Sequence, residues 1–310
     1  MKGAAMSEKN RSDSLRLPDL KAGRDKSEEK KHPPRRKRAG RRQSDWWCGF
    51  ILLLMVAAAC FYGFYLSPYE PGQLIPNGRL QPPSTAHLMG TDHLSRDLLT
   101  RVGQGTAATL IVAVGVNLFA GALGLLLGAL AGYFGGAADW LVLRLTDTLL
   151  AFPGILMALL LLTVMGRGLP QLILALGLAF TPSYARITRS AFRLYRGRDF
   201  VKRLEVMGAP PWRILFIHLA PLLREQYRDA VGIGLANAIL AESGMSFLGF
   251  GTQEPWISWG VMLSEARAYL FRAPWQAIFP GLAIITTVFG IFLLARGRAP
   301  WRKGGESLVR

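Results

Sequence analysis

The chain has 310 residues, of which 51% are hydrophobic and 18% are charged, and its mean hydropathy is +0.25. Its 37 Lys and Arg residues outnumber its 20 Asp and Glu residues, which gives a formal net charge of +17. Only two cysteines are present, Cys48 and Cys60, and their spacing excludes both a disulfide framework and a CxxC metal site. The charged residues fall in blocks between long uncharged runs, a pattern typical of a polytopic membrane protein.

The long apolar runs predict an all-α fold with six membrane-spanning helices. A helix needs about 20 predominantly apolar residues to cross a bilayer. Five runs satisfy this, at residues 46–66, 105–134, 148–166, 168–185 and 273–295. A sixth, at 229–251, is interrupted by Glu242. An ionisable group at membrane depth normally faces protein or water, so Glu242 is a candidate for a side chain on a transport path.

The distribution of positive charge predicts that both ends of the chain lie in the cytoplasm. With this topology, 31 of the 37 Lys and Arg residues lie on the cytoplasmic side. The extracytoplasmic segments hold only six: three in residues 67–104, one at Arg167 and two in residues 242–272. The positive-inside rule therefore favours an N-in, C-in arrangement.

A hydrophilic tail with 15 basic and 7 acidic residues occupies positions 1–45, and its composition predicts disorder. The run HPPRRKRAGRR at 32–42 would suit nucleic acid, but directly before a span it is better explained as a topology signal that attracts anionic lipid. The apolar run at 46–66 then predicts a retained anchor, and residues 297–310 predict a second basic cytoplasmic tail. No nucleic-acid partner is expected.

The Pro-, Gly- and Asn-rich stretch at 67–104 predicts an extracytoplasmic loop. It carries His87 and His93, with Asp92 nearby, which together offer metal-ligand chemistry. Histidines in a polar loop more commonly only form hydrogen bonds, so we expect no metal site.

The second span carries Gly124, Gly128 and Gly132 four residues apart, on one helical face. Small residues at this spacing allow two helices to pack closely in lipid; the alternative is a face that lines a substrate path. Near the start of the third span, Arg144 is three residues from Asp147, which allows a local ion pair.

A short basic segment, DFVKRLEVMGAPPWRILFIHLAP at 199–221, lies between the fourth and fifth spans. Asp199 is a candidate cap for a helix that Gly208 ends in the left-handed conformation, and a second helix is predicted over 212–220. The segment is too charged to cross lipid, and the positive-inside rule places it in the cytoplasm. It is therefore predicted to dock against a cytoplasmic partner.

The sequence contains no recognisable catalytic motif. It has no GxxxxGK[ST] phosphate loop, so the chain is not expected to hydrolyse ATP by itself. HExxH and GxSxG are also missing. An enzyme is therefore not expected, and neither is a cofactor.

Several ordered motifs resemble the inner-membrane permease subunits of binding-protein-dependent ABC importers of the dipeptide, oligopeptide and nickel group, in particular the second of the two permease partners. HLMGTDHLSRD at 87–97 is similar to the family pattern H-x-x-G-T-D-x-x-G-R-D, with Ser95 where glycine is usual. Similar stretches follow at 131–153, 184–190, 241–270 and 273–284. The resemblance covers about His87 to Leu294.

The segment 199–221 resembles the family's signature, in which E-A-A and three residues precede a glycine, followed by a spacer and L-P. Lys202, Arg203 and Leu204 stand where E-A-A is usual, and Ala220 replaces the leucine before the final proline. The resemblance implies that this segment is a coupling helix held by an ATPase subunit. The residues it assigns to coupling are Lys202, Arg203, Glu205, Gly208, Ala209, Pro210, Trp212, His218 and Pro221.

The resemblance further implies a bacterial inner-membrane location and four kinds of partner: a homologous permease, two ATP-binding subunits, an extracytoplasmic binding protein and membrane lipid. Peptides are the expected cargo, and nickel or a metal chelate is the alternative. From other classes, an ion-driven secondary transporter or channel and a membrane scaffold recruited by the basic tail remain open. Glu242 is the one ionisable candidate deep in a predicted span, which makes an ion-driven transporter less favoured.

Overall fold

The computed structural model describes residues 35–70 and 72–296, and all regular elements in these ranges are helical. Contacts between residues divide the chain into two units, Met1–Ala39 and Gly40–Arg310. Of the first unit, the structure describes only residues 35–39, at the beginning of α1. The second unit contains the rest of the fold.

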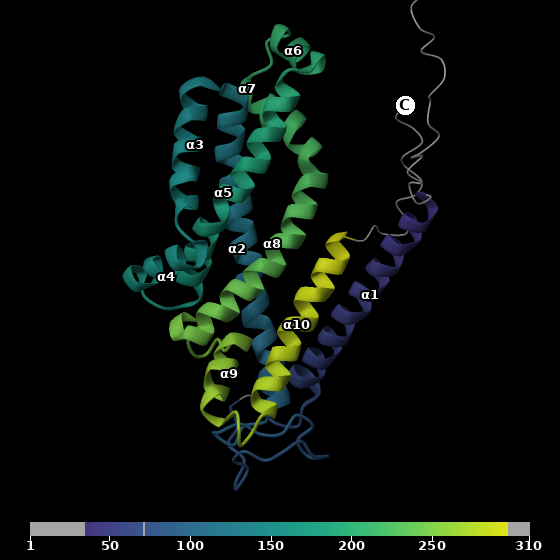
Figure 1. The fold of residues 1–310 in the computed structure, drawn as a ribbon, viewed down its shortest axis with the longest axis vertical. Helices are drawn as coiled ribbons and strands as arrows, with labels where there is room; N and C mark the ends of the chain where they lie inside the picture. Colours follow the sequence, from purple (N-terminus) through teal and green to yellow (C-terminus); the bar gives the residue numbers. More distant parts are fainter. Residues whose placement is uncertain (1–34, 71, 297–310) are drawn as a thin grey trace, which may run out of the picture. The chain divides into compact units, whose positions relative to one another are not determined.

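Ten α-helices follow one another along the described chain (Figure 1). They are α1 (Arg35–Phe61), α2 (Leu98–Phe134), α3 (Gly136–Ala151), α4 (Gly154–Met165), α5 (Leu169–Arg196), α6 (Asp199–Val206), α7 (Pro211–Arg213), α8 (Arg224–Met245), α9 (Trp259–Ala266) and α10 (Trp275–Arg296). Short π- or 3₁₀-helical turns at Tyr62–Leu66, Ile214–Leu219, Ala220–Leu223, Ser246–Phe250 and Arg267–Tyr269 connect or extend them.

The long helix α2 packs along α5 through the face that carries the glycines at 124, 128 and 132. A Cβ atom on Gly124 or Gly128 would collide with Tyr184 or Thr188 of α5. On Gly132 it would lie 2.7 Å from the carbonyl oxygen of Arg189. The structure therefore places all three glycines at a close helix contact, where no larger side chain fits without movement.

Two apolar cores hold the second unit together. The larger is built from α2, α4, α5, α8, α9 and α10, and Trp259 is its largest fully buried side chain. The smaller lies where α2 and α5 meet the segment 199–223, around Phe192, Val201, Ile214 and Leu219. It fixes the short helix α6 to the ends of two long helices.

Four helical stretches are long and apolar enough to cross a bilayer: Ser44–Phe61, Leu98–Phe134, Pro211–Phe250 and Trp275–Arg296. The span expected over 148–166 is instead broken, since α3 ends at Ala151, α4 begins at Gly154 and the two axes differ by 90°. Counting this bent pair gives up to five spans in the described part of the chain. The helix α5, over the fourth predicted span, is 28 residues long, but arginines fill its last turns and it is not among these stretches.

Several element boundaries differ from those expected. The helix α1 begins at Arg35, inside the segment predicted to be disordered up to residue 45, and α2 begins at Leu98, within the predicted loop 67–104. Asp199 is the first residue of α6 rather than its cap, and no side chain caps this helix. Pro221 does not end the helix predicted over 212–220, because a 3₁₀ turn continues the chain into α8. The tails 1–34 and 297–310 lie outside the described residues.

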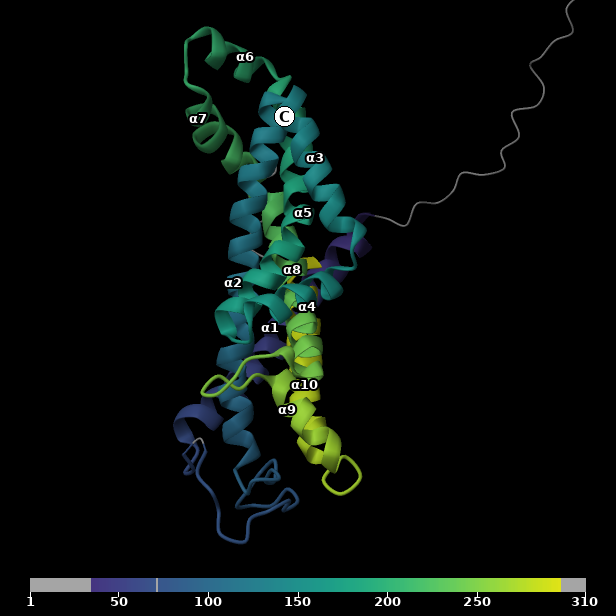
Figure 2. The ribbon, with the colours of Figure 1, turned by 90° about the vertical axis from the view of Figure 1, so that its left-hand side faces the viewer.

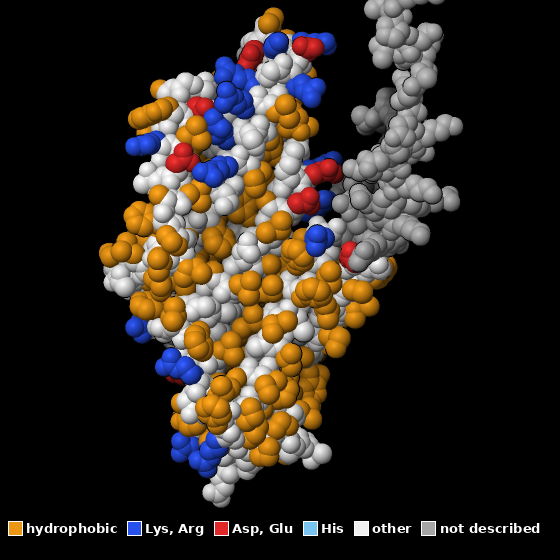
Figure 3. Space-filling view, viewed as in Figure 1, with side chains coloured by type: hydrophobic (Ala, Val, Ile, Leu, Met, Phe, Trp, Pro, Cys, Tyr) orange, Lys and Arg blue, Asp and Glu red, His pale blue; other side chains and the backbone are white. Residues whose placement is uncertain are grey.

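The two views of the second unit place α6 and α7 at one end and the loop 67–97 with α9 toward the other (Figures 1 and 2). We call these the α6 end and the loop end. Apolar side chains cover the middle of the face in Figure 3, and Lys and Arg side chains gather toward the α6 end. This banded surface is typical of a protein whose middle faces lipid.

Candidate functional site

The projecting segment at the α6 end presents an apolar tip to solvent. Val206 is 88% exposed, Met207 is 79% exposed and Trp212 is 60% exposed. Gly208 forms the turn between α6 and α7 with φ of +74°, a conformation that glycine adopts without strain. Pro211 opens α7, where its missing N–H costs no hydrogen bond. The sequence thus builds a tight corner whose apolar side chains are largely exposed.

The base of this segment is fixed to the long helices by apolar burial and by hydrogen bonds. Val201 is fully buried, and Leu204 and Ala209 pack against the same core. Tyr133, near the end of α2, donates a hydrogen bond of 2.9 Å from its hydroxyl to the Glu205 carboxylate. On the neighbouring α5, Arg189 forms an ion pair with Asp139 of α3, including a contact of 2.7 Å from Nη2 to Oδ2. A hydrogen bond and a shared apolar core thus join the base of α6 to α2.

The residues assigned to coupling lie on one connected segment but differ in exposure. Lys202, Arg203 and Glu205 are exposed, as are Gly208, Pro210, Trp212 and Pro221, whereas Ala209 and His218 are half-buried. Glu205 accepts the Tyr133 hydroxyl and keeps its negative charge, so the cations Lys202 and Arg203 outnumber it by two to one beside the tip.

At the loop end, the motif at 87–97 forms a buried hydrogen-bond network. Asp92 Oδ1 accepts the backbone N–H groups of Leu94 and Arg96, both at 2.8 Å. Its Oδ2 accepts Arg96 Nε and Arg101 Nη1, both at 2.7 Å. Arg101 Nη1 also donates a hydrogen bond of 2.8 Å to Glu265 of α9. One guanidinium in α2 therefore connects the loop with α9.

The rest of the motif caps α2 and shapes the loop. Asp97 accepts the backbone N–H of Thr100 at 3.0 Å, as a helix-capping side chain does, and lies 3.0 Å from His87 Nδ1. Gly90 has φ of +78°, and a Cβ atom there would lie 2.6 Å from the Gln81 carbonyl oxygen. Ser95 has φ of +62°, a left-handed conformation that explains the glycine usual at this position in the family pattern.

The two loop histidines do not converge on one site. His87 faces Asp97 and Tyr69, whereas His93 stacks on Tyr269. Asp92, His93 and Glu265 do bring possible ligand atoms within 4.8 Å of one another. The two carboxylates, however, already bind Arg96 and Arg101, and guanidinium groups at this distance oppose a metal cation. The cluster is better explained as a structural network.

Glu242 lies in α8 and is fully buried. It accepts a hydrogen bond of 2.6 Å from Ser246, and Ser243 lies 3.4 Å from its other oxygen. Ser246 in turn lies 3.3 Å from Ser258, whose hydroxyl caps α9. The carboxyl group thus joins α8 to α9, and its partner Ser246 lines a pocket whose lining does not include Glu242.

Reasoning from the sequence missed two features of these sites. Tyr133 carries no sequence signal for its bond to Glu205, because the two residues are 72 positions apart. Arg167, which enters the sequence argument only as one of the extracytoplasmic cations, lines a pocket. The available signal was its isolation as the sole cation between two long apolar runs.

An all-helical chain with several long apolar helices, an apolar middle and a projecting charged segment at one end is a polytopic membrane protein. The chain belongs to the family described as binding-protein-dependent transport system inner membrane component, whose model matches residues 124–301. It is therefore a multi-pass inner-membrane permease of the ABC importer class.

Named relatives support this assignment. The glutathione transport system permease protein GsiD of Pectobacterium atrosepticum is 37% identical over 76% of this chain and 79% of its own. The dipeptide transport system permease protein DppC of Haemophilus influenzae is 34% identical, covering 75% and 81%. The nickel transport system permease protein NikC of Escherichia coli is 34% identical, covering 73% and 82%.

A solved structure shares the fold. The chain aligns with one from the MetNI methionine ABC transporter in an inward-facing conformation, with a TM-score of 0.51 and 19% identity. The alignment covers 65% of this chain and 97% of the other. At this identity the similarity shows the fold alone.

Proposed function

We propose that this chain forms half of the translocation path of an ABC importer for peptides, and that its α6–α7 segment couples the path to a separate ATP-hydrolysing subunit. The observation that carries the proposal is the solvent-exposed apolar tip formed by Val206, Met207 and Trp212. Large apolar side chains clustered on a projecting, charged segment are typical of a protein interface.

The anchoring of the segment supports a mechanical role. Val201, Ile214 and Leu219 are at least 99% buried in the smaller core, so the tip cannot move independently of α2 and α5. Force applied to the tip would therefore reach the membrane-crossing helices rather than be absorbed by a flexible loop. This is the property that a coupling element needs.

The charge beside the tip indicates the character of the partner surface. Lys202 and Arg203 are exposed, and the neighbouring Glu205, which accepts a hydrogen bond from Tyr133, offsets only one of their two charges. We therefore expect the ATPase cleft that receives α6 to carry acidic residues, since like charges across an interface are destabilising.

The remaining partners follow from the same proposal. A homologous permease would complete the path, two ATP-binding subunits would supply the energy, and an extracytoplasmic binding protein would deliver the cargo. Relatives named for glutathione and dipeptides favour peptide cargo, and the nickel permease relative makes nickel or a metal chelate the alternative. Uptake of labelled dipeptide against nickel-63 distinguishes the two.

The coupling role is tested by crosslinking from the tip. In a Cys48→Ser/Cys60→Ala background, we expect Val206→Cys to crosslink to a co-expressed candidate ATPase, whereas Phe271→Cys at the loop end should not. Gly208→Asp should abolish substrate-stimulated ATPase activity and leave membrane insertion intact, because the open surroundings of Gly208 confine the damage to the turn.

Two outcomes would count against the proposal in different ways. If the ATPase co-purifies but never crosslinks through Val206→Cys, the importer assignment survives and the coupling role of α6 does not. If no candidate ATPase co-purifies with a monodisperse chain, the assignment to an importer subunit is itself contradicted.

A further inference from the structure

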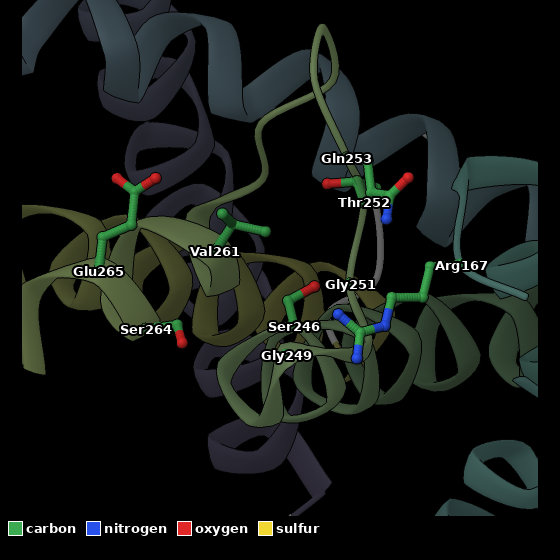
Figure 4. A pocket seen from close by; sticks show the side chains of 9 residues that line it. All are labelled: Arg167, Ser246, Gly249, Gly251, Thr252, Gln253, Val261, Ser264 and Glu265. Atoms are coloured by element: carbon green, nitrogen blue, oxygen red, sulfur yellow. The ribbon is translucent and has the colours of Figure 1, made fainter. Parts of the chain in front are cut away.

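A pocket of about 180 Å³ lies between the α4–α5 turn and the connection from α8 to α9. Figure 4 shows Arg167 on one side of it and Glu265 on the other, with Ser246 and Gly251 between them. Thr252 and Gln253 complete the polar lining. At about 30 Å³ for each water, the volume corresponds to about six water molecules. The pocket therefore suits one end of a short peptide rather than a whole oligopeptide.

Arg167 is held at the pocket by the geometry of its turn. Gly166 and Gly168 on either side have φ of +84° and +150°, conformations that a residue with a side chain rarely adopts. The guanidinium carbon lies 5.3 Å from the centroid of the Phe250 ring, within cation–π distance. Within residues 35–70 and 72–296, no carboxylate pairs with this guanidinium, so its positive charge is not neutralised by the chain.

The other charged side chain of the pocket is neutralised. Glu265 accepts Arg101 Nη1 at 2.8 Å and lies 3.7 Å from Arg96 Nη2. Because Arg96 and Arg101 also pair with Asp92, two guanidiniums balance two carboxylates in this network, and Glu265 adds no net negative charge to the pocket wall. The net charge left for a ligand in the pocket is positive.

A buried polar group also points to a ligand. Thr252 is only 5% exposed, yet its hydroxyl has no hydrogen-bond partner in the described chain. A buried hydroxyl without a partner is costly and is usually satisfied by water or a ligand. The side-chain amide of Gln253 on the same wall offers further donors.

We propose that this pocket binds a carboxylate, with Arg167 as the charged group and Thr252 and Gln253 as neutral donors. The planar guanidinium pairs with a carboxylate through two parallel hydrogen bonds. Resting on the proposed function, the carboxylate is the C-terminal group of a short peptide, which the pocket would orient as the peptide leaves the binding protein.

The charge of the pocket is tested by cysteine chemistry on the full-length chain in detergent. Gln253→Cys is introduced into the Cys48→Ser/Cys60→Ala background and treated with two thiosulfonate reagents, one bearing a sulfonate and one a trimethylammonium group. We expect the sulfonate reagent to react faster. Arg167→Gln should lower the ratio of the two rates about tenfold, because it removes the uncompensated charge beside the thiol, and Arg167→Lys should preserve the ratio.

Thr85→Cys, an exposed residue of the loop 67–97, is the matched control, and its ratio should not respond to Arg167→Gln. Variants are compared only when they elute as the parent chain does. An unchanged ratio at Gln253→Cys in a well-folded Arg167→Gln chain would overturn the proposal. So would an equal change at Thr85→Cys, which would indicate a general effect of charge.

Ligand chemistry is tested by protection of Gln253→Cys. Diglycine should slow modification, glycylglycinamide should not, and inorganic phosphate should have little effect. Equal protection by the amide, or protection by phosphate alone, would exclude carboxylate recognition. These results do not depend on any ATPase, so their failure is distinguishable from failure of the coupling role.

Discussion

At the residue scale, Asp92 is the centre of the loop-end network. Burial alone would raise the pKa of its carboxyl group, but hydrogen bonds from Arg96 and the charge of Arg101 outweigh burial and hold the pKa below its ordinary value. The group is therefore ionised whenever the fold is intact near neutral pH. Its stabilising effect is present above the unfolded pKa of about 3.9 and is lost as pH falls through the lower folded pKa.

Replacing Asp92 by Asn should lower the apparent melting temperature of the detergent-solubilised chain at pH 7. The loss should correspond to about 3 kcal/mol, because two buried arginines lose their shared partner. The difference from the parent chain should shrink progressively as pH falls below about 4 and through the lowered folded pKa of Asp92, where the parent carboxylate also becomes protonated.

Glu70→Gln is the control for this experiment, since Glu70 is an exposed acid near the start of the same loop, and it should change the melting temperature little at any pH. A melting temperature for Asp92→Asn equal to that of the parent at pH 7 would show that the network does not stabilise the fold.

At the element scale, the contact between α2 and α5 depends on the missing side chains of α2. A Cβ atom on Gly128 would meet Thr188 and lie 2.5 Å from the Ala185 carbonyl oxygen, which belongs to rigid backbone. By contrast, a Cβ atom on Gly244 of α8 would have open space around it. The two glycines thus offer a matched pair within long helices.

We expect Gly128→Ala to lower the apparent melting temperature by about 5 °C, because overpacking forces the helices apart at a cost of about 1–3 kcal/mol. Gly244→Ala should leave it unchanged or slightly higher, since alanine favours helix more than glycine does. Thermal unfolding followed by circular dichroism measures both. Equal effects of the two substitutions would show that helix propensity, not packing, governs the response.

One ion pair that the sequence predicts within a single helix forms between two helices instead. Arg144 and Asp147 have suitable spacing in α3, yet Asp147 pairs with Arg186 of α5 at 2.7 Å. Both partners are more than half exposed, so this pair contributes little to stability. The pair shows that α3 and α5 lie close together, which no local sequence pattern predicts.

At the scale of the whole molecule, the N-in, C-in topology stays a prediction: Lys and Arg side chains are most numerous toward the α6 end of the second unit, and a smaller group lies near the opposite end (Figure 3). The helix α1 packs beside α10, where a Cβ atom on Gly49 would lie 2.7 Å from the Gly290 carbonyl oxygen.

Cysteine labelling in intact cells tests this orientation. In the Cys48→Ser/Cys60→Ala background, an impermeant reagent should label Phe271→Cys directly and Met207→Cys only after permeabilisation. Both side chains are well exposed, so accessibility within the fold does not limit either reaction. The reverse pattern would invert the proposed topology and place the coupling segment outside the cell.

The sequence by itself determined the all-helical membrane class, the family and the position of the projecting segment, because apolar run length, charge blocks and turn residues act locally along the chain. It also gave the glycine spacing that suits close packing. Only the tertiary structure decided the break at Phe152 and Pro153, the bond between Tyr133 and Glu205 and the charge balance around Arg167. These features depend on which helices meet, and local patterns in a single sequence do not specify which helix packs against which.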